Sequence, residues 1–377
     1  MASLRTITKR FFIFLNVGIG LLFLLSCCNS FLHPDKWWFI SLLAFLFPVF
    51  LISLILFLIF WLFNAPRIAL FSLFCLLIGW QNIHAFFGFG LHKNDFSKKE
   101  SGSIRILTWN VRRWDEFITK KIDGAGHRLP MFELVRQKNA DILCFQEFYE
   151  PADTAKSNIR YIQTNLGYPY YYFSRNYRNR FTKYETGVII FSKYPIVDTA
   201  QQKFSADSVQ QSESLISADV EVEGKRIRIY TTHLQSVLFK SKDFRNVEII
   251  RNVQDSMLQA SRSLAKKLKY ALGLRGYQAD MVRTQLDSCR YPMVICGDFN
   301  DVPNSYTYFH IRGKLQDAFI ERCFGVGRSY VQISPTLRID YIFPSEDFTV
   351  VQTMKQVSPY SDHHAMVTDL RLRDAKR

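Results

Sequence analysis

Three stretches of this 377-residue chain lack charged side chains altogether: residues 11–32, 38–63 and 68–91 contain no Asp, Glu, Lys or Arg. Each is longer than the roughly 20 residues with which a helix crosses a bilayer. A helix that is apolar on every side is not an ordinary surface helix of a soluble domain. We therefore expect residues 1–92 to form a membrane anchor with three transmembrane helices.

The chain also lacks any pattern among its cysteines. Its seven cysteines include no CxxC pair and no other metal-binding spacing. Neither a zinc site nor a disulfide framework is therefore expected. Internal repeats and low-complexity tracts are absent as well.

Acidic residues are scarce at the N-terminal end. Residues 1–92 carry five basic residues and a single acid, Asp35, whereas residues 93–377 carry 43 basic and 32 acidic residues, a net charge of +11. This excess suits a phosphate-bearing partner or an anionic membrane surface. A basic surface that is simply solvated fits the charge equally well.

Basic residues around the apolar runs bear on membrane orientation. Three of them precede the first run and favour a cytoplasmic N-terminus: Arg5, Lys9 and Arg10. Three lysines after the third run favour the reverse: Lys93, Lys98 and Lys99. Residues 24–27 resemble a lipoprotein cleavage site, but the two apolar runs that follow favour a multi-pass protein. We expect a multi-pass protein of the bacterial inner membrane, with its C-terminal domain outside the cytoplasm.

After a polar linker at 93–103, short apolar runs indicate a soluble α/β domain over 104–377. Strands are expected at 104–111, 142–145, 170–174, 187–192, 214–221, 225–232, 293–296, 339–343 and 366–372. A helix is expected at 129–138, with Asn139 as its stop. A long basic helical stretch lies between Ser236 and Arg290. If its residues Arg262, Lys266 and Lys269 share one face, we expect that face to lie along the membrane.

Several of these apolar runs end in a polar group. The residues concerned are Asn110, Glu147, His233, Asp298 with Asn300, and Asp362 with His363, while Asp340 lies inside another run. The pattern is clearest at 297–300. Gly297 frees the backbone there, and an Asp and an Asn two residues apart fall on one side of the strand end. Alone, this tetrapeptide is equally typical of an Asx-rich turn.

The residue types indicate a chemistry. Buried carboxylates are costly unless they are paired or bind a cation. A hard cation such as Mg²⁺ takes carboxylate and carboxamide oxygens and keeps waters that a phosphate can replace. A ligand set of this kind, together with two histidines that are not needed as metal ligands, suits metal-assisted hydrolysis of a phosphoester. Asp340 has a plainer interpretation, as a partner of Arg338.

Six short motifs occur in an order that resembles a known family. They are Trp109-Asn110, Gln146-Glu147, Thr232-His233-Leu234, Gly297–Asn300, Arg338–Ile342 and Ser361–His363. The set is similar to the signature of the endonuclease/exonuclease/phosphatase superfamily, which includes deoxyribonuclease-I-like nucleases. The resemblance covers 104–377. It implies a mixed α/β (α+β) fold, a four-layer α-β-β-α sandwich of two mixed sheets, here preceded by the three transmembrane helices.

The resemblance also implies how the metal and the water are held. It implies Glu147 as the main ligand of Mg²⁺ or Mn²⁺, with Asn110 and Asp340 assisting. Asp298 then orients or deprotonates the attacking water, and Asn300 holds the phosphate.

For the histidines, the resemblance implies that His363 stabilises the developing phosphoryl charge or protonates the leaving oxygen, with its ring fixed by Asp362. It implies His233 as a second phosphate contact. His364 stands where the family pattern has a variable residue, and it is an alternative to His363 as the working histidine.

The expected function is therefore that of a membrane-anchored, Mg²⁺-dependent phosphoester hydrolase of the phosphodiesterase or endonuclease type. The substrate alternatives are nucleic acid and a phospholipid headgroup, the latter as in a sphingomyelinase-like or phosphoinositide-type enzyme. A non-catalytic sensor of a phosphorylated ligand is a third interpretation.

Overall fold

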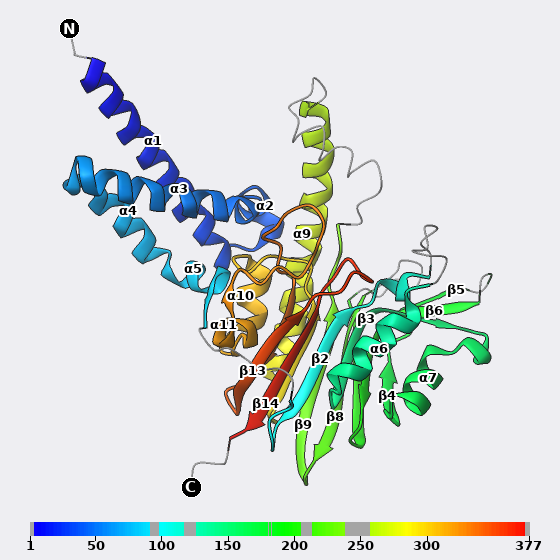
Figure 1. Cartoon of the computed structure of the whole chain (residues 1–377). Coiled ribbons are helices and arrows are strands. Elements are labelled where there is room, and N and C mark those ends of the chain that lie inside the picture. The colour runs from blue at the N-terminus through cyan, green and yellow to red at the C-terminus, as the bar shows by residue number, and fades with distance from the viewer. Residues whose placement is uncertain are drawn as a thin grey trace. The chain divides into compact units, whose positions relative to one another are not determined.

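Figure 1 shows the computed structural model of the chain, which describes residues 4–90, 98–116, 126–179, 181, 183–204, 213–237 and 257–373. Two compact units are present. One contains Met1–Phe87, Val237–Tyr277 and Asp301–His310, and the other contains Gly88–Ser236, Gln278–Asn300 and Ile311–Arg377. Most of the expected linker at 93–103 and part of the expected helical stretch after Ser236 lie outside the described residues.

The N-terminal unit is helical. Its elements are α1 (Leu4–Cys27), η1 (Cys28–Ser30), α2 (Pro34–Ser41), α3 (Leu43–Asn64), α4 (Pro66–Ile78) and α5 (Trp80–Phe86). Among the described residues, Leu4–Ser30 and Pro34–Asn64 are long and apolar enough to cross a membrane, and they correspond to the first two expected spans. Charged residues lie only near the start of each stretch: Arg5, Lys9 and Arg10 in the first, and Asp35 and Lys36 in the second.

The third expected span is not one straight helix. Helices α4 and α5 are bent by 63° at Gly79, so the described chain has two candidate spans, or three if the bent pair counts as one. A Cβ atom at Gly79 would lie 2.4 Å from the ring of Phe23. The chain therefore approaches α1 closely where the helix breaks.

The same unit contains segments from much later in the sequence. They are the first two thirds of α9 (Met257–Asp287), as far as Tyr277, and residues 301–310, which include most of α10 (Tyr306–Arg312). The N-terminal helices therefore form one compact unit with parts of the C-terminal region.

The other unit is built on two mixed sheets. The seven-stranded sheet has the order β13-β14-β2-β3-β6-β4, with β5 attached to β6, and the five-stranded sheet has the order β12-β10-β9-β8-β7. Strands β2 and β3 are parallel, as are β9 and β10, and the other neighbours are antiparallel. The expected fold class is confirmed.

The strand bounds follow the expected apolar runs closely. The strands are β2 (Ile104–Asn110), β3 (Ile142–Pro151), β4 (Tyr170–Phe173), β5 (Tyr177–Asn179), β6 (Tyr184–Ser192), β7 (Ile196–Lys203), β8 (Ser214–Val222), β9 (Lys225–His233), β10 (Met293–Asp298), β12 (Asp340–Pro344), β13 (Phe348–Gln356) and β14 (Ala365–Leu372), with a short β1 (Gly88–Phe89) paired to β11 (Phe324–Gly325). Strands β8 and β9 form an antiparallel hairpin that turns at Glu223-Gly224.

Five of the described strands have no counterpart among the expected ones: the two-residue strands β1 and β11, and β5, β7 and β13. The edge strand β7 has the sequence IVDTAQQK, and most of it is exposed, so it lacks the apolar run that marks a buried strand. A second difference is at β3, which was expected to stop at Gln146-Glu147 and instead continues to Pro151 through a bulge.

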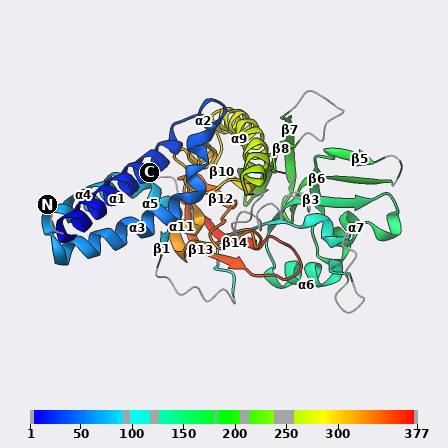
Figure 2. The same cartoon turned by 90° about the horizontal axis from the view of Figure 1, so that it is seen from above.

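The core has two parts. Residues from both sheets meet between them, including Ile106, Ile190, Ile229 and Cys296. The outer face of the seven-stranded sheet packs against α6 (Arg128–Lys138) and α7 (Asn158–Asn165), which Figures 1 and 2 show along β3 and β6. Helix α6 ends at Asn139, whose φ of 46° is the left-handed cap that the sequence predicts. Helix α11 (Ala318–Arg322) contributes to the inter-sheet cluster.

Candidate active site

Strand register brings the polar strand ends together. Asp298, the last residue of β10, is paired with His233 at the end of β9 and with Asp340 at the start of β12. On the other sheet, Asn110 ends β2 beside Gln146 of β3. Because side chains alternate along a strand, a shift of one residue in any of these pairings would turn a polar group away from the site.

Asp298 lies at the centre of the cluster and is buried. Its Oδ2 atom accepts a hydrogen bond from Asn110 Nδ2 at 3.0 Å. The same oxygen lies 3.6 Å from His233 Nε2 and 3.7 Å from His363 Nε2. One carboxylate oxygen therefore faces an amide and two imidazoles.

The partner of His363 is Asp340. The His363 Nδ1 atom is hydrogen-bonded to Asp340 Oδ2 at 2.9 Å, and both side chains are buried. The backbone of His363 is held as well, because its carbonyl accepts a hydrogen bond from the Trp109 indole and its N–H donates to Ser361 Oγ. This fixes one ring nitrogen on Asp340 and turns the other towards Asp298.

The expected partner, Asp362, has a different contact. Its Oδ2 lies 3.5 Å from Arg112 Nε. His364 is also engaged elsewhere: its Nδ1 accepts a hydrogen bond from the backbone N–H of Ser358. Burial lowers the pKa of His364 to about 4, so its imidazole is neutral near pH 7. These contacts favour His363 over His364 as the working histidine.

His233 has a carboxylate partner that the sequence did not reveal. Glu213 Oε1 lies 3.2 Å from His233 Nδ1. Glu213 immediately precedes β8, and no motif marks it, so only the pairing of β8 with β9 brings it to the histidine. The site therefore contains two carboxylate–histidine pairs, one on either side of Asp298.

The charges of these pairs raise the basicity of both histidines. Burial alone lowers the pKa of His363, but the carboxylates of Asp340 and Asp298 outweigh it and raise this pKa to about 10. Burial likewise opposes the effect of Glu213 and Asp298 on His233, whose pKa is also raised to about 10. Both imidazoles are therefore cationic at neutral pH in the metal-free protein.

Glu147 is placed at the site by the bulge in β3. The ladder with β6 shifts between Phe145 and Phe148, and Glu147 has a φ of 48°. A bulge re-aims the side chain of its extra residue. The Glu147 carboxylate accepts a hydrogen bond from Asn110 Nδ2 at 3.3 Å, and its side chain is about one-third exposed (31%). Asn110 thus links Glu147 to Asp298.

The turn after β10 is shaped by Gly297 and Asn300. Gly297 has a φ of 140°, and a Cβ atom there would lie 2.1 Å from the carbonyl oxygen of Thr232, so only glycine fits. Asn300 has a φ of 53°, and its N–H donates to Asp298 Oδ1 at 2.9 Å. Its amide donates to the carbonyl of Leu234. The Asx turn that the sequence allows is therefore present, and it fixes the Asp298 carboxylate.

A left-handed turn follows Asn110. Four successive residues have φ between 46° and 59°: Arg112, Arg113, Trp114 and Asp115. Such backbone costs about 1–2 kcal/mol per residue outside glycine. The indole of Trp114 is buried against Phe132 and Phe145, and this packing supports the turn. The turn brings Arg113 Nε to 3.8 Å from Glu147 Oε2.

The donor set suits a hard divalent cation. Glu147, Asp298 and Asp340 supply carboxylate oxygens, and ligand atoms of Asp298, Asp340 and His363 lie within 4.8 Å of one another. Among the described residues, the buried Asp340 Oδ1 accepts no hydrogen bond. Burial raises the pKa of Asp340, which a bound cation would offset. Oxygen-rich sites of this kind suit Mg²⁺ or Mn²⁺ rather than a metal that prefers thiolates.

All the site residues expected from the sequence therefore lie in this cluster or in the turns that hold it. Asn110, Glu147, His233, Asp298, Asp340 and His363 converge directly. Asn300 borders the cluster because its N–H donates to Asp298. Asp362 borders it through its contact with Arg112.

Comparison with known proteins agrees with this geometry. Residues 107–363 match the model of the Endonuclease/Exonuclease/phosphatase family, and residues 9–86 match a domain of unknown function, DUF8431. A search of the curated proteins gives no match. Since the first match covers more than half of the chain, the chain belongs to the endonuclease/exonuclease/phosphatase family, whose members are hydrolases of phosphoester bonds.

Solved structures share the fold at low sequence identity. The catalytic domain of human Nocturnin is 16% identical, with 73% of this chain and 97% of that chain covered and a TM-score of 0.50. A family member from Leptotrichia buccalis C-1013-b is 16% identical over 71% of this chain and 100% of that chain, with a TM-score of 0.50. One from Bacteroides thetaiotaomicron is 16% identical over 72% and 96%, with a TM-score of 0.50. At such identities the likeness shows the fold alone.

Proposed function

We propose that this protein is a membrane-anchored, divalent-metal-dependent phosphodiesterase. The observation that carries the proposal is the surroundings of Asp298, whose Oδ2 faces Asn110, His233 and His363 within 3.7 Å. A carboxylate that orients water and two cationic imidazoles that face a phosphoryl group are the parts that phosphoester hydrolysis needs.

We assign Glu147 as the principal residue that would hold the cation. Its side chain is the most exposed of the site carboxylates, and Asn110 aligns it. Asn110 Oδ1 accepts the N–H of Arg112, so this residue would ligate the ion only after a half-turn of its amide group. When bound, Mg²⁺ or Mn²⁺ supplies positive charge against the phosphate oxygens.

The protein groups divide the proton chemistry between them. Asp298 orients the attacking water and accepts its proton. His363 protonates the leaving oxygen from Nε2, while Asp340 holds the proton on Nδ1 and keeps the ring in place. His233, oriented by Glu213, contacts a non-bridging oxygen of the phosphate. Asn300, whose amide group donates to the carbonyl of Leu234 next to His233, is assigned as a further phosphate contact.

A phospholipid headgroup is the second candidate substrate, because two stretches of the chain are long and apolar enough to hold the protein in a bilayer. A membrane-held enzyme meets lipid phosphoesters at high local concentration. Nucleic acid is the first candidate substrate, and the basic excess of residues 93–377 supports it.

One experiment separates these substrates. The full chain, purified in detergent with Mg²⁺ or Mn²⁺, is incubated with supercoiled plasmid and, separately, with mixed micelles that contain sphingomyelin or a phosphoinositide. Asp298→Asn serves as the control. Plasmid nicking that needs both metal and Asp298 assigns the nuclease type, and headgroup release with the same requirements assigns the lipid type. Binding of either substrate without turnover would overturn the enzymatic proposal and favour a sensor.

For the orientation, we propose that the catalytic domain lies outside the cytoplasm, as the basic residues before the first apolar run favour. Reporter fusions after Arg373 test this. Activity of a periplasmic alkaline phosphatase fusion is expected, and activity of a cytoplasmic fluorescent reporter alone would reverse the orientation.

A further inference from the structure

The turn between the first two apolar helices is bound to α9. Asp35 accepts a hydrogen bond from the Tyr277 hydroxyl at 2.8 Å. The imidazole of His33 packs between Tyr277 and Tyr306, with ring centroids 5.0 Å from each. Residues more than two hundred positions apart in the sequence therefore meet within one compact unit.

This contact is close because α9 presents glycine there. A Cβ atom at Gly276 would lie 2.7 Å from Pro34 Cγ and 2.9 Å from the His33 ring. At Gly273 it would lie 3.5 Å from Asp35 Oδ1. One turn further towards the N-terminus of α9, the Lys269 ammonium lies 5.3 Å from the centroid of the Trp38 ring, a cation–π contact.

The turn marks the level of the membrane surface. It joins the two apolar stretches Leu4–Ser30 and Pro34–Asn64, so in a bilayer it lies among the headgroups, where Asp35 and Lys36 remain solvated. Phe31 and Trp37 are exposed there, as interfacial aromatic residues are. Residues of α9 that touch this turn consequently lie at the same level.

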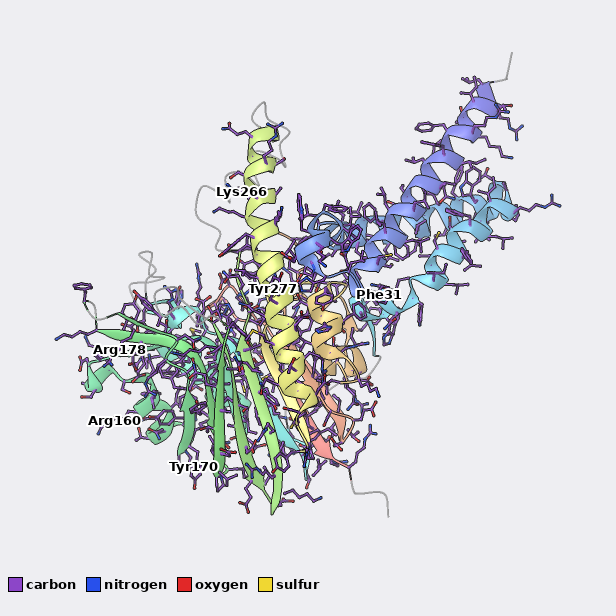
Figure 3. The ribbon with its side chains drawn as sticks, turned by 180° about the vertical axis from the view of Figure 1, so that it is seen from behind. Phe31, Arg160, Tyr170, Arg178, Lys266 and Tyr277 are labelled. Atoms are coloured by element: carbon purple, nitrogen blue, oxygen red, sulfur yellow. The ribbon has the colours of Figure 1, made fainter. Side chains whose placement is uncertain are left out.

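The basic residues of α9 share the face that touches the turn. At 100° per residue, Arg262, Lys266, Lys269, Gly273 and Tyr277 lie within about 80° of one another around the helix. The three basic side chains are exposed, and so is Tyr270 beside them (63%). Leu264, Ala271 and Arg275 occupy the opposite face and are buried. Figure 3 labels Lys266 and Tyr277 on this helix and Phe31 at the turn.

The segment of α9 from Met257 to Tyr277 carries no acid of its own. It contains no Asp or Glu and five basic residues, of which Arg275 is buried: Arg262, Lys266, Lys267, Lys269 and Arg275. Such a helix, with basic and aromatic side chains at headgroup level, is complementary to anionic lipid.

We propose that the face of α9 formed by Arg262, Lys266, Lys269 and Tyr270 binds anionic phospholipid headgroups. The proposal rests on the membrane anchoring proposed above, since the turn defines the bilayer surface. The surface is distinct from the catalytic cluster, which is built from strand ends of the other compact unit. The lipid bound here is a contact of the protein and not its substrate.

The test uses the full chain in lipid nanodiscs made either of phosphatidylcholine alone or of phosphatidylcholine mixed with phosphatidylglycerol. Hydrogen exchange of peptides from 259–277 is measured by mass spectrometry. In the wild type, phosphatidylglycerol is expected to slow amide exchange in this segment by about fivefold or more. About fivefold is the gain in affinity for an anionic surface that a single basic residue provides.

Two triple variants make the test specific. Arg262→Gln/Lys266→Gln/Lys269→Gln is expected to lose the lipid dependence. Arg160→Gln/Lys203→Gln/Lys225→Gln removes the same charge from exposed positions on the other unit and is expected to retain it. Equal exchange in both lipids for the wild type, or an undiminished effect in the first variant, would overturn the proposal.

The anchoring is checked separately by carbonate extraction of native membranes. A chain that carbonate releases would refute the proposed anchoring. A chain that stays in the membrane but shows no dependence on phosphatidylglycerol would refute only the lipid-binding face.

Discussion

At the scale of single residues, the surroundings of the Asp298 carboxylate are built by side chains from four different strands or strand ends. Asn110 comes from β2, His233 from β9, Asp340 from β12 and His363 from the residue pair before β14. Each of these groups is buried, so its position is fixed by packing rather than by the substrate.

Asp298→Asn tests the central role directly. Asparagine keeps the shape and the acceptor for the Asn300 N–H, but it cannot take a proton from water. We expect kcat for a chromogenic phosphodiester such as bis(p-nitrophenyl) phosphate to fall by about 10³-fold, while circular dichroism shows that the variant is still folded. A variant that keeps a large share of the activity would contradict the assignment.

The pairing of His363 with Asp340 is tested by the pH dependence of kcat. Protonated His363 is the acid, so activity is lost as the pH rises through its pKa. Asp340→Asn removes the charge that raises this pKa, so we expect the basic limb of the profile to move to lower pH by more than about one unit. Asp362→Asn is the matched control, and its profile should stay close to that of the wild type. The opposite result would restore Asp362 as the partner.

Glu147→Gln tests the metal site without relying on turnover. A cation that binds the folded state alone stabilises it. We therefore expect Mg²⁺ or Mn²⁺ to raise the melting temperature of the wild type by a few degrees, EDTA to reverse this, and Glu147→Gln to abolish it. If Glu147→Gln shifts as the wild type does, the ion is held elsewhere.

Among the elements, α9 offers a matched pair of substitutions. Gly276→Ala places a methyl group against Pro34 and His33, and overpacking of this kind costs about 1–3 kcal/mol. Gly273→Ala meets only ordinary contacts at 3.5 Å and gains about 1 kcal/mol of helix propensity. The melting temperature in detergent should therefore fall for Gly276→Ala and rise or stay unchanged for Gly273→Ala. Equal effects would show that the turn is not packed on α9.

The elements also show what a sequence can and cannot reveal. Apolar runs that end in Asn110, His233 and Asp298 predict both the strands and a polar cluster, because strand ends gather at one edge of a sheet. The Asp340–His363 pair joins β12 of one sheet to the residues before β14 of the other, and no local pattern encodes that contact between sheets. Glu213 reaches His233 through the β8–β9 hairpin, but no motif marks it as a site residue.

At two places the backbone conformation could not be predicted from the local sequence. The bulge that carries Glu147 lies inside an ordinary-looking strand sequence, so the strand was expected to end there. The left-handed turn at 112–115 contradicts the preferences of its own residues, and the burial of Trp114 stabilises it. In both cases tertiary packing outweighs local propensity.

For the whole molecule, the chain passes between the two compact units five times, at 87/88, 236/237, 277/278, 300/301 and 310/311. The catalytic region is therefore joined to the other unit by several chain connections and not by a single linker. A fragment that starts at Gly88 lacks His33 and Asp35, which hold α9. We expect residues 269–277 of such a fragment to exchange their amide hydrogens about tenfold faster or more than in the full chain, as measured by mass spectrometry.

Strands β9 and β10 serve as the internal reference in that comparison, because none of their sheet partners is removed. Their exchange should be alike in the two proteins. Equal protection of residues 269–277 would mean that α9 is stable without the anchor.

The contact between Asp35 and Tyr277 also has a topological consequence. Two residues that touch must lie on the same side of a bilayer, so the chain between them crosses it an even number of times. Where α3 supplies one crossing, the bent pair α4–α5 has to supply the second, despite its 63° break. With the proposed anchoring, a single hydrogen bond between a turn and a distant helix thus requires an even number of membrane crossings between residues 35 and 277.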